Sequence, residues 1–208
     1  MTVSHWIVFI SFFICSASCL FKLLQVLFAN KNQDFAQQRG SIFSAIIYSF
    51  SGAMSPYKKE TAYLHLPTYI AGIIYHLGTF LSFAWLIIHF FNFHITTTLA
   101  TGSWILLIIS AGCGLSIFIK RLVNSKLKII STLDDFFSNL LVTGFQILSA
   151  LALLTLISTD PLFIYASILF LYVPLGKLNH VIYFFTSRIH LGILFGKRGT
   201  WPPGRREI

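Results

Sequence analysis

The sequence predicts an all-α membrane protein with five transmembrane helices, and three observations lead to this prediction. Of the 208 residues, 56% are hydrophobic and only 10% are charged, whereas a soluble domain carries about 25% charged residues. Five apolar stretches are long enough to cross about 30 Å of hydrocarbon as helices. None of them alternates with the period of two of a membrane-barrel strand. The 22 Phe residues also exclude a disordered or collagen-like chain.

The five predicted spans follow one another along most of the chain. They cover residues 6–29, 63–91, 98–119, 136–157 and 162–185. The first span is interpreted as an uncleaved helix, because no Lys or Arg precedes it as in a signal peptide. We divide the chain into a membrane domain, 1–195, and a basic cytoplasmic tail, 196–208.

Basic residues predict the orientation of the spans, because Lys and Arg accumulate in cytoplasmic loops. Nearly all of them lie between the first two spans, around the link between the third and fourth spans, or after the fifth span. These residues are Lys31, Arg39, Lys58, Lys59, Lys120, Arg121, Lys126, Lys128, Arg188, Lys197, Arg198, Arg205 and Arg206. The N-terminus is therefore predicted outside and the C-terminus in the cytoplasm, in the inner membrane. The net charge of +9 is explained by topology, so nucleic acid is not an expected partner.

Two segments outside the spans carry helix signals. Residues 35–50 set the polar Gln37, Gln38 and Arg39 against the apolar Ile42, Phe43, Ile46 and Ile47, which favours an amphipathic helix on the membrane surface over a disordered loop. Residues 131–135 place N-cap candidates and two acids before the fourth span, as a helix N-terminus favours. The three cysteines lie in apolar stretches without the spacing of a disulfide framework or an iron–sulfur ligand set.

Four of the seven histidines are candidate metal ligands, because an imidazole inside a membrane needs a partner or a metal. His5, His89 and His94 fall near the predicted outer boundary, where water and headgroups satisfy them. His65 and His76 are eleven residues apart in the second span, which on an α-helix is about 16 Å of rise with a facial offset of about 20°. They are expected to point at the same neighbour.

The fifth span supplies the other two candidates. His180 and His190 are ten residues apart, or about 15 Å with an offset of about 80°. The second and fifth spans run antiparallel in the predicted topology, so His65 would face His190 near the cytoplasm and His76 would face His180 further out. Two facing pairs suit two bis-histidine b-type haems, whose iron the imidazoles would hold.

Small and charged residues near these histidines extend the haem hypothesis. Gly72 lies seven residues after His65, about 20° from its face, and Gly176 lies four before His180, where each would leave room for a porphyrin edge. Glycines also serve helix packing in membranes. Lys177 is predicted inside the fifth span, where a buried ammonium needs an anion or acceptor. A propionate of the outer haem or a quinone carbonyl would serve, which makes Lys177 a candidate catalytic contact.

The chain resembles the gamma subunit of respiratory nitrate reductase and its relatives, the cytochrome b subunits linked to heterodisulfide reductase and to sulfite reduction. The resemblance is carried by Ser131-Thr132-Leu133-Asp134-Asp135-Phe136-Phe137-Ser138 after the basic Lys120-Arg121, and by Pro174-Leu175-Gly176-Lys177-Leu178-Asn179-His180. It covers most of residues 1–195. The ligand spacings here differ from those of the nitrate reductase subunit, which leaves one haem as an alternative to two.

The resemblance implies an electron-transport subunit that exchanges electrons between the quinone pool and a cytoplasmic oxidoreductase module through its haems. The module would be an iron–sulfur protein like heterodisulfide reductase or a molybdenum enzyme, since this chain has no motif for the second substrate. Membrane lipid and quinone are the other expected partners. Two alternatives stay open. One is a small transporter or proton channel lined by the histidines, and the other is a membrane anchor without cofactor.

Overall fold

The computed structural model describes residues 2–29, 35, 37–58 and 62–203, which form helices and connecting segments without a strand. The chain divides into two compact units. Unit 1 comprises Met1–Ser18 and Pro67–Leu178, and unit 2 comprises Cys19–Leu66 and Asn179–Ile208. Four of the predicted basic residues, Lys31, Lys59, Arg205 and Arg206, lie outside the described residues, as does residue 36 of the predicted surface helix.

Four helices are long and apolar enough to cross a membrane, and they confirm the first four predicted spans to within a few residues. They are α1 (Val3–Phe28), α3 (Leu66–Phe91, continuing the short η2, Ala62–His65), α4 (Thr97–Val123) and α6 (Leu133–Leu153). Many large apolar side chains on them are exposed, such as Phe13, Leu77 and Ile119. Water does not favour so much apolar surface. The fold is therefore that of a helical membrane protein with four or five spans.

The fifth predicted span is broken, so the prediction of one continuous helix over 162–185 is wrong. Helix α7 (Thr159–Tyr172) ends, and the chain resumes as η3 (Lys177–Asn179) and α8 (His180–Lys197). The sequence explains the break, because Pro174 has no N–H to continue the helical ladder. The N–H groups of Leu175 and Gly176 both donate to the Tyr172 carbonyl, at 2.9 and 3.0 Å. With 14 residues, α7 rises about 21 Å, less than the hydrocarbon thickness.

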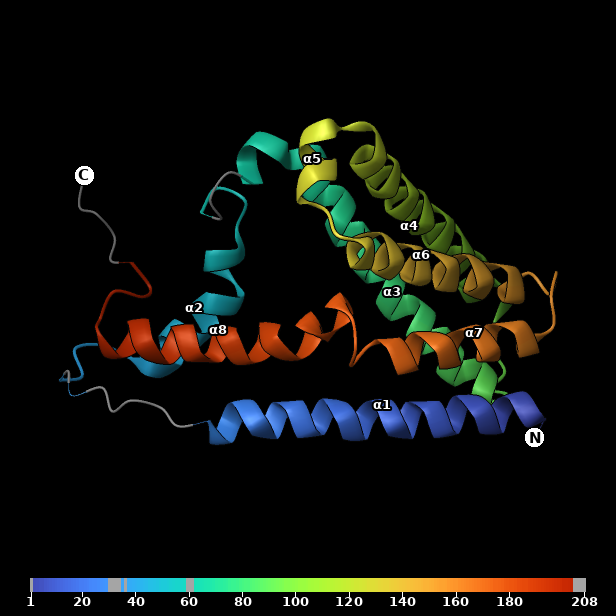
Figure 1. The fold of residues 1–208 in the computed structure, drawn as a ribbon, viewed down its shortest axis with the longest axis horizontal. Helices are drawn as coiled ribbons and strands as arrows, with labels where there is room; N and C mark the ends of the chain where they lie inside the picture. The colour runs from blue at the N-terminus through green and yellow to red at the C-terminus, as the bar shows by residue number, and fades with distance from the viewer. Residues whose placement is uncertain (1, 30–34, 36, 59–61, 204–208) are drawn as a thin grey trace. The chain divides into compact units, whose positions relative to one another are not determined.

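Helix α6 is the centre of unit 1. In its most apolar segment, half of the residues are buried, whereas the corresponding share in the other three spans is between 17 and 28%. Figure 1 shows α6 running beside α4 and beside α7. Rings from α3 and α7 complete the packing, with Phe83 5.0 Å from Phe145 and 5.8 Å from Phe170 between centroids. A helix surrounded on several sides by protein can carry polar side chains without exposing them to lipid.

The start of α6 confirms the predicted N-terminal signals. The backbone N–H of Thr132 donates to Asp135 Oδ2 at 2.8 Å, and the Thr132 hydroxyl lies 3.0 Å from the same oxygen. This is one half of a capping box, in which the acid at the third helical position returns to the cap residue. The short α5 (Ser125–Ile130) precedes it and is capped by the Asn124 side chain.

Unit 2 contains an antiparallel pair of helices, α2 (Ile42–Phe50) and α8. Close approach depends on two glycines one helical turn apart. A Cβ at Gly192 would stand 2.6 Å from Ile46 Cα, and one at Gly196 would stand 2.8 Å from Ala45 Cβ. Only the second half of the predicted surface helix, 35–50, is helical, because Ser41 caps α2 by accepting from the Ser44 N–H at 3.3 Å.

The predicted domain boundary after residue 195 stays a prediction. Helix α8 continues past it to Lys197, and residues 204–208 of the predicted tail lie outside the described residues.

Candidate functional site

His76 has a geometry that suits an iron ligand. It lies in the middle of α3 with an exposed side chain, and its Nδ1 is 2.7 Å from the Gly72 carbonyl oxygen. A carbonyl only accepts, so the hydrogen bond assigns the proton to Nδ1 and the lone pair to Nε2. Metal-bound imidazoles commonly donate their second N–H to such an acceptor, which orients the ring and selects the tautomer.

Gly72 adds space beside this imidazole. No heavy atom of the described residues lies within 4 Å of the position that a Cβ at Gly72 would occupy. Four residues on a helix bring Gly72 to the same side of α3 as His76. The two residues therefore combine an oriented imidazole with an open helix surface, as a large planar ligand requires.

A cluster of buried polar side chains holds the segment of α3 next to His76. Gln146 of α6 is fully buried, and its Nε2 donates to the Tyr75 carbonyl and to Thr79 Oγ1, both at 2.9 Å. Its Oε1 accepts from the hydroxyl of Ser110, on α4, at 3.0 Å. We call Gln146, Ser110, Thr79, Tyr75 and Thr143 the polar cluster.

The polar cluster joins three helices. Ser110 Oγ also lies 3.1 Å from the Ile74 carbonyl oxygen and 3.3 Å from that of Tyr75. The Tyr75 hydroxyl donates to the Asn139 carbonyl at 3.0 Å and lies 3.1 Å from Thr143 Oγ1. The sequence analysis missed this cluster. Its signal was present in the sequence, since Thr143 and Gln146 lie three residues apart, and therefore near each other on one face, within a predicted membrane span.

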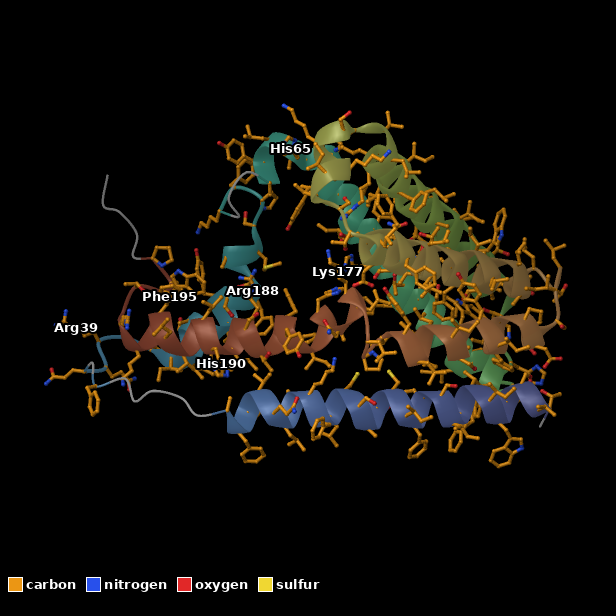
Figure 2. All side chains as sticks on the ribbon, in the orientation of Figure 1. Arg39, His65, Lys177, Arg188, His190 and Phe195 are labelled. Atoms are coloured by element: carbon orange, nitrogen blue, oxygen red, sulfur yellow. The ribbon has the colours of Figure 1, made fainter. Side chains whose placement is uncertain are left out.

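Lys177 lies against the N-terminal end of α6, because the break after α7 brings it there. Its Nζ is 2.6 Å from Asp135 Oδ2, and its backbone N–H donates to Asp134 Oδ2 at 2.8 Å. Figure 2 shows Lys177 beside this end of α6. Arg121 Nη1 lies 3.3 Å from the other oxygen of Asp135.

This position corrects two expectations for Lys177. The side chain is half exposed rather than deep in a continuous span, and its anion is a carboxylate of this chain. It also lies at the end of the bundle that carries Arg121, which the charge distribution predicts to be cytoplasmic. The predicted contact of Lys177 with a propionate of the outer haem stays a prediction.

Gly176 has a structural role beside the predicted one. A Cβ at this position would overlap the ring of Tyr172, whose hydroxyl bonds Asp134 and lies 3.1 Å from Ser138 Oγ. A larger residue at this position would require the Tyr172 ring to move away from Asp134 and Ser138. The predicted role of Gly176 in cofactor binding stays a prediction.

The other three predicted ligands belong to unit 2. His65 is exposed at the end of η2, so the about 20° offset from His76, which assumed one continuous α-helix, does not apply. His180 is exposed at the first position of α8, and His190 is half-buried in its middle. Figure 2 shows His65 and His190 on separate elements, and Arg188 and His190 on opposite sides of α8.

The outer histidines differ from one another. His5 packs its ring on Phe163, with centroids 4.6 Å apart, and its Nδ1 lies 2.8 Å from the Thr2 hydroxyl. His94 is exposed. His89 Nε2 is buried and has no hydrogen-bond partner among the described residues. The expectation that water and headgroups satisfy all three therefore does not hold for His89.

Within the described ranges, no group of three or more His, Cys, Asp and Glu side chains is arranged to hold a metal ion. A bis-histidine haem takes only two protein ligands, so this observation does not bear on the haem hypothesis. Comparison with models of known protein families, with curated proteins and with solved structures finds no match. The functional argument therefore depends on the residues of this chain.

Proposed function

We propose that this chain is a membrane cytochrome b subunit that exchanges electrons between the quinone pool and a cytoplasmic oxidoreductase module. The observation that carries the proposal is the His76 imidazole, tied through Nδ1 to the Gly72 carbonyl at 2.7 Å beside an open helix surface.

The proposed ligand pairs are His76 with His180 and His65 with His190. Haem supplies one-electron transfer when bound, and the imidazoles of this chain hold it and tune its potential. Gly72 leaves space for the porphyrin edge. One haem, held by the pair that contains His76, is the smaller version of the same proposal.

Lys177 has a defined role in this proposal. Its ammonium is paired with Asp135, and Arg121 contacts the same carboxylate. Lys177 can therefore turn toward a propionate or a quinone carbonyl while Asp135 keeps one cationic partner. The exchange avoids leaving an unpaired carboxylate at the helix end, which would be costly.

The proposed partner is a cytoplasmic iron–sulfur protein or molybdenum enzyme, and the proposed location is the inner membrane. Two features of the sequence support this: the basic residues predicted on the cytoplasmic side, and the resemblance of the segments around Asp135 and Lys177 to membrane cytochrome subunits. Electrons leaving the membrane need an acceptor on that side.

The first test is a reduced-minus-oxidised optical spectrum of the purified protein with a pyridine haemochrome count. We expect one or two b haems per chain, and one fewer in His76→Ala. His94→Ala is the matched control, because His94 is exposed in the loop after α3 and should leave the count unchanged. A colourless wild-type protein would refute the cytochrome proposal and favour a transporter or an anchor. An unchanged count in His76→Ala would remove His76 from the ligand set.

A further inference from the structure

We propose that Gln146 is a positioning residue, which holds α3 in one rotation about its axis and thereby aims the His76 imidazole. The inference rests on the proposed function, because it concerns the orientation of a haem ligand. It gives the polar cluster a role, fixing the rotation of α3, that the proposed function alone does not require.

The contacts of Gln146 are concentrated on the residues that flank His76. Its Nε2 donates to the carbonyl of Tyr75, the residue directly before His76, and to the hydroxyl of Thr79, three residues after it. The Gln146 amide thus forms hydrogen bonds to two residues of one turn of α3. Two bonds to different points of one turn restrict rotation and translation together.

Ser110 of α4 adds a second set of contacts to the same turn of α3. Its hydroxyl has a single hydrogen to donate, shared among Gln146 Oε1 at 3.0 Å and the carbonyl oxygens of Ile74 and Tyr75 at 3.1 and 3.3 Å. Helix α4 therefore contacts the turn of α3 next to His76 directly through Ser110, and Ser110 also contacts the side-chain amide of Gln146. Inside an apolar bundle such bonds have no competing water, so alternative rotations of α3 leave polar groups without partners.

Close packing removes the remaining freedom on this side of α3. A Cβ at Gly78 would overlap Ser110, and one at Gly114 would overlap both Thr143 and the Tyr75 ring. Gly78 is two residues after His76, which places it about 160° around the helix from that imidazole. The closely packed side of α3, with Gly78, is therefore opposite the side that carries His76. A rotation of α3 that loosened the packing at Gly78 would also move the His76 imidazole.

The rotation also moves Gly72 with His76, since the bond from Nδ1 to the Gly72 carbonyl lies within α3. Loss of Gln146 should therefore leave the imidazole tautomer unchanged. It should instead change the direction in which Nε2 meets iron. A ligand that meets iron at a poorer angle gives a changed ligand field and a weaker hold on the haem.

The experiment compares Gln146→Leu and Gln146→Glu with Ser149→Ala in the full chain. Ser149 is a matched control, because it is fully buried one turn further along α6 and bonds only the Phe145 carbonyl of its own helix. The measurements are the low-spin ferric haem signal in electron paramagnetic resonance, the midpoint potential, and the rate of haem loss to an acceptor protein.

For Gln146→Leu we expect a displaced low-spin signal, a shifted potential and haem loss about tenfold faster, as for other residues that orient metal ligands. Gln146→Glu keeps an oxygen acceptor, but a buried protonated carboxyl has one O–H in place of the two N–H donors that reach Tyr75 and Thr79, so it should shift in the same direction by a smaller amount. Ser149→Ala should match the wild type in all three measurements, including the signal position, which general loss of stability does not move.

Two results overturn the inference in different ways. Wild-type protein with a low-spin haem whose signal and potential are the same in both Gln146 variants would refute the positioning role and leave the cytochrome proposal intact. Wild-type protein without any low-spin haem would refute the proposed function and this inference together.

Discussion

Two helix contacts in this protein are built by different means. In unit 1, α3 meets α4 and α6 through hydroxyl and amide groups that bond backbone carbonyls, with Gln146 fully buried at the centre. In unit 2, α2 meets α8 over Gly192 and Gly196, and Ser49 Oγ donates to the Arg188 carbonyl at 2.9 Å. Small residues let backbones approach closely, and polar side chains determine the rotation of one helix against another.

The difference teaches where each contact is vulnerable. The contact in unit 2 depends on the absence of two Cβ atoms and should fail when volume is added. The contact in unit 1 already contains side chains and should fail when a polar partner is removed. Hydrogen bonds between membrane helices contribute only about 0.6 kcal/mol on average, whereas overpacking costs about 1–3 kcal/mol. Added volume should therefore have the larger effect.

The largest effect is expected for Gly192→Ala. The new Cβ would stand 2.6 Å from Ile46 Cα and 2.9 Å from Ile46 N, so backbone must move, and we expect a loss of about 2 kcal/mol in the free energy of unfolding. Gly102→Ala on α4 is the matched control, because no described atom lies within 4 Å of its Cβ position. Titration with a denaturing detergent measures both. Equal midpoints would show that α2 and α8 are not in contact in the protein.

A smaller effect is expected for Ser110→Ala. The change removes the hydroxyl that bonds Gln146 and the α3 carbonyls, without adding volume, so we expect a loss of about 1 kcal/mol. Ser116→Ala, further along α4, serves as its control, since Ser116 bonds only the Cys113 carbonyl within α4. The same detergent titration applies. If Ser110→Ala lowered the free energy of unfolding by more than Gly192→Ala does, removing a polar partner would be more damaging than adding volume, and the expected order would be wrong.

The smallest effect is expected for the ion pair at the end of α6. A double-mutant cycle with Asp135→Asn and Lys177→Met should give a coupling energy of about 0.5 kcal/mol, because the Lys177 side chain is half exposed. Raising the salt concentration should reduce the coupling. A coupling above about 2 kcal/mol would mean that lipid or protein excludes water from this ion pair. Lys177 and Asp135 would then contribute as much as a buried contact, and the expected order of the three effects would be wrong.

Hydropathy predicted the first four spans because each is a local property of the chain. The break between Tyr172 and Lys177 was not predicted, since apolar residues continue on both sides of it from Leu162 to Phe185, long enough together for one span. Pro174 was a signal for the break. It was outweighed by the length of the stretch, because proline is tolerated in membrane helices.

The candidate site was predictable only in its local part. The exposed His76 and the open surface at Gly72 follow from helical spacing within α3. The pairing of Lys177 with Asp135 joins residues 42 positions apart, and the bond from Gln146 to Tyr75 joins residues 71 positions apart. Such contacts depend on which helices become neighbours and how they are rotated, and hydrophobic periodicity does not contain this information.

The shared carboxylate of Asp135 has a consequence for the charges from which the orientation is predicted. During synthesis, orientation is decided by Lys and Arg near the ends of emerging helices, and acidic residues contribute little. Arg121 is one of the basic residues from which the orientation is predicted. In the folded protein Arg121 and Lys177 both lie within 4 Å of Asp135. The carboxylate therefore neutralises part of the positive charge at this end of unit 1, and it joins the end of α4 and the segment after α7 to the beginning of α6.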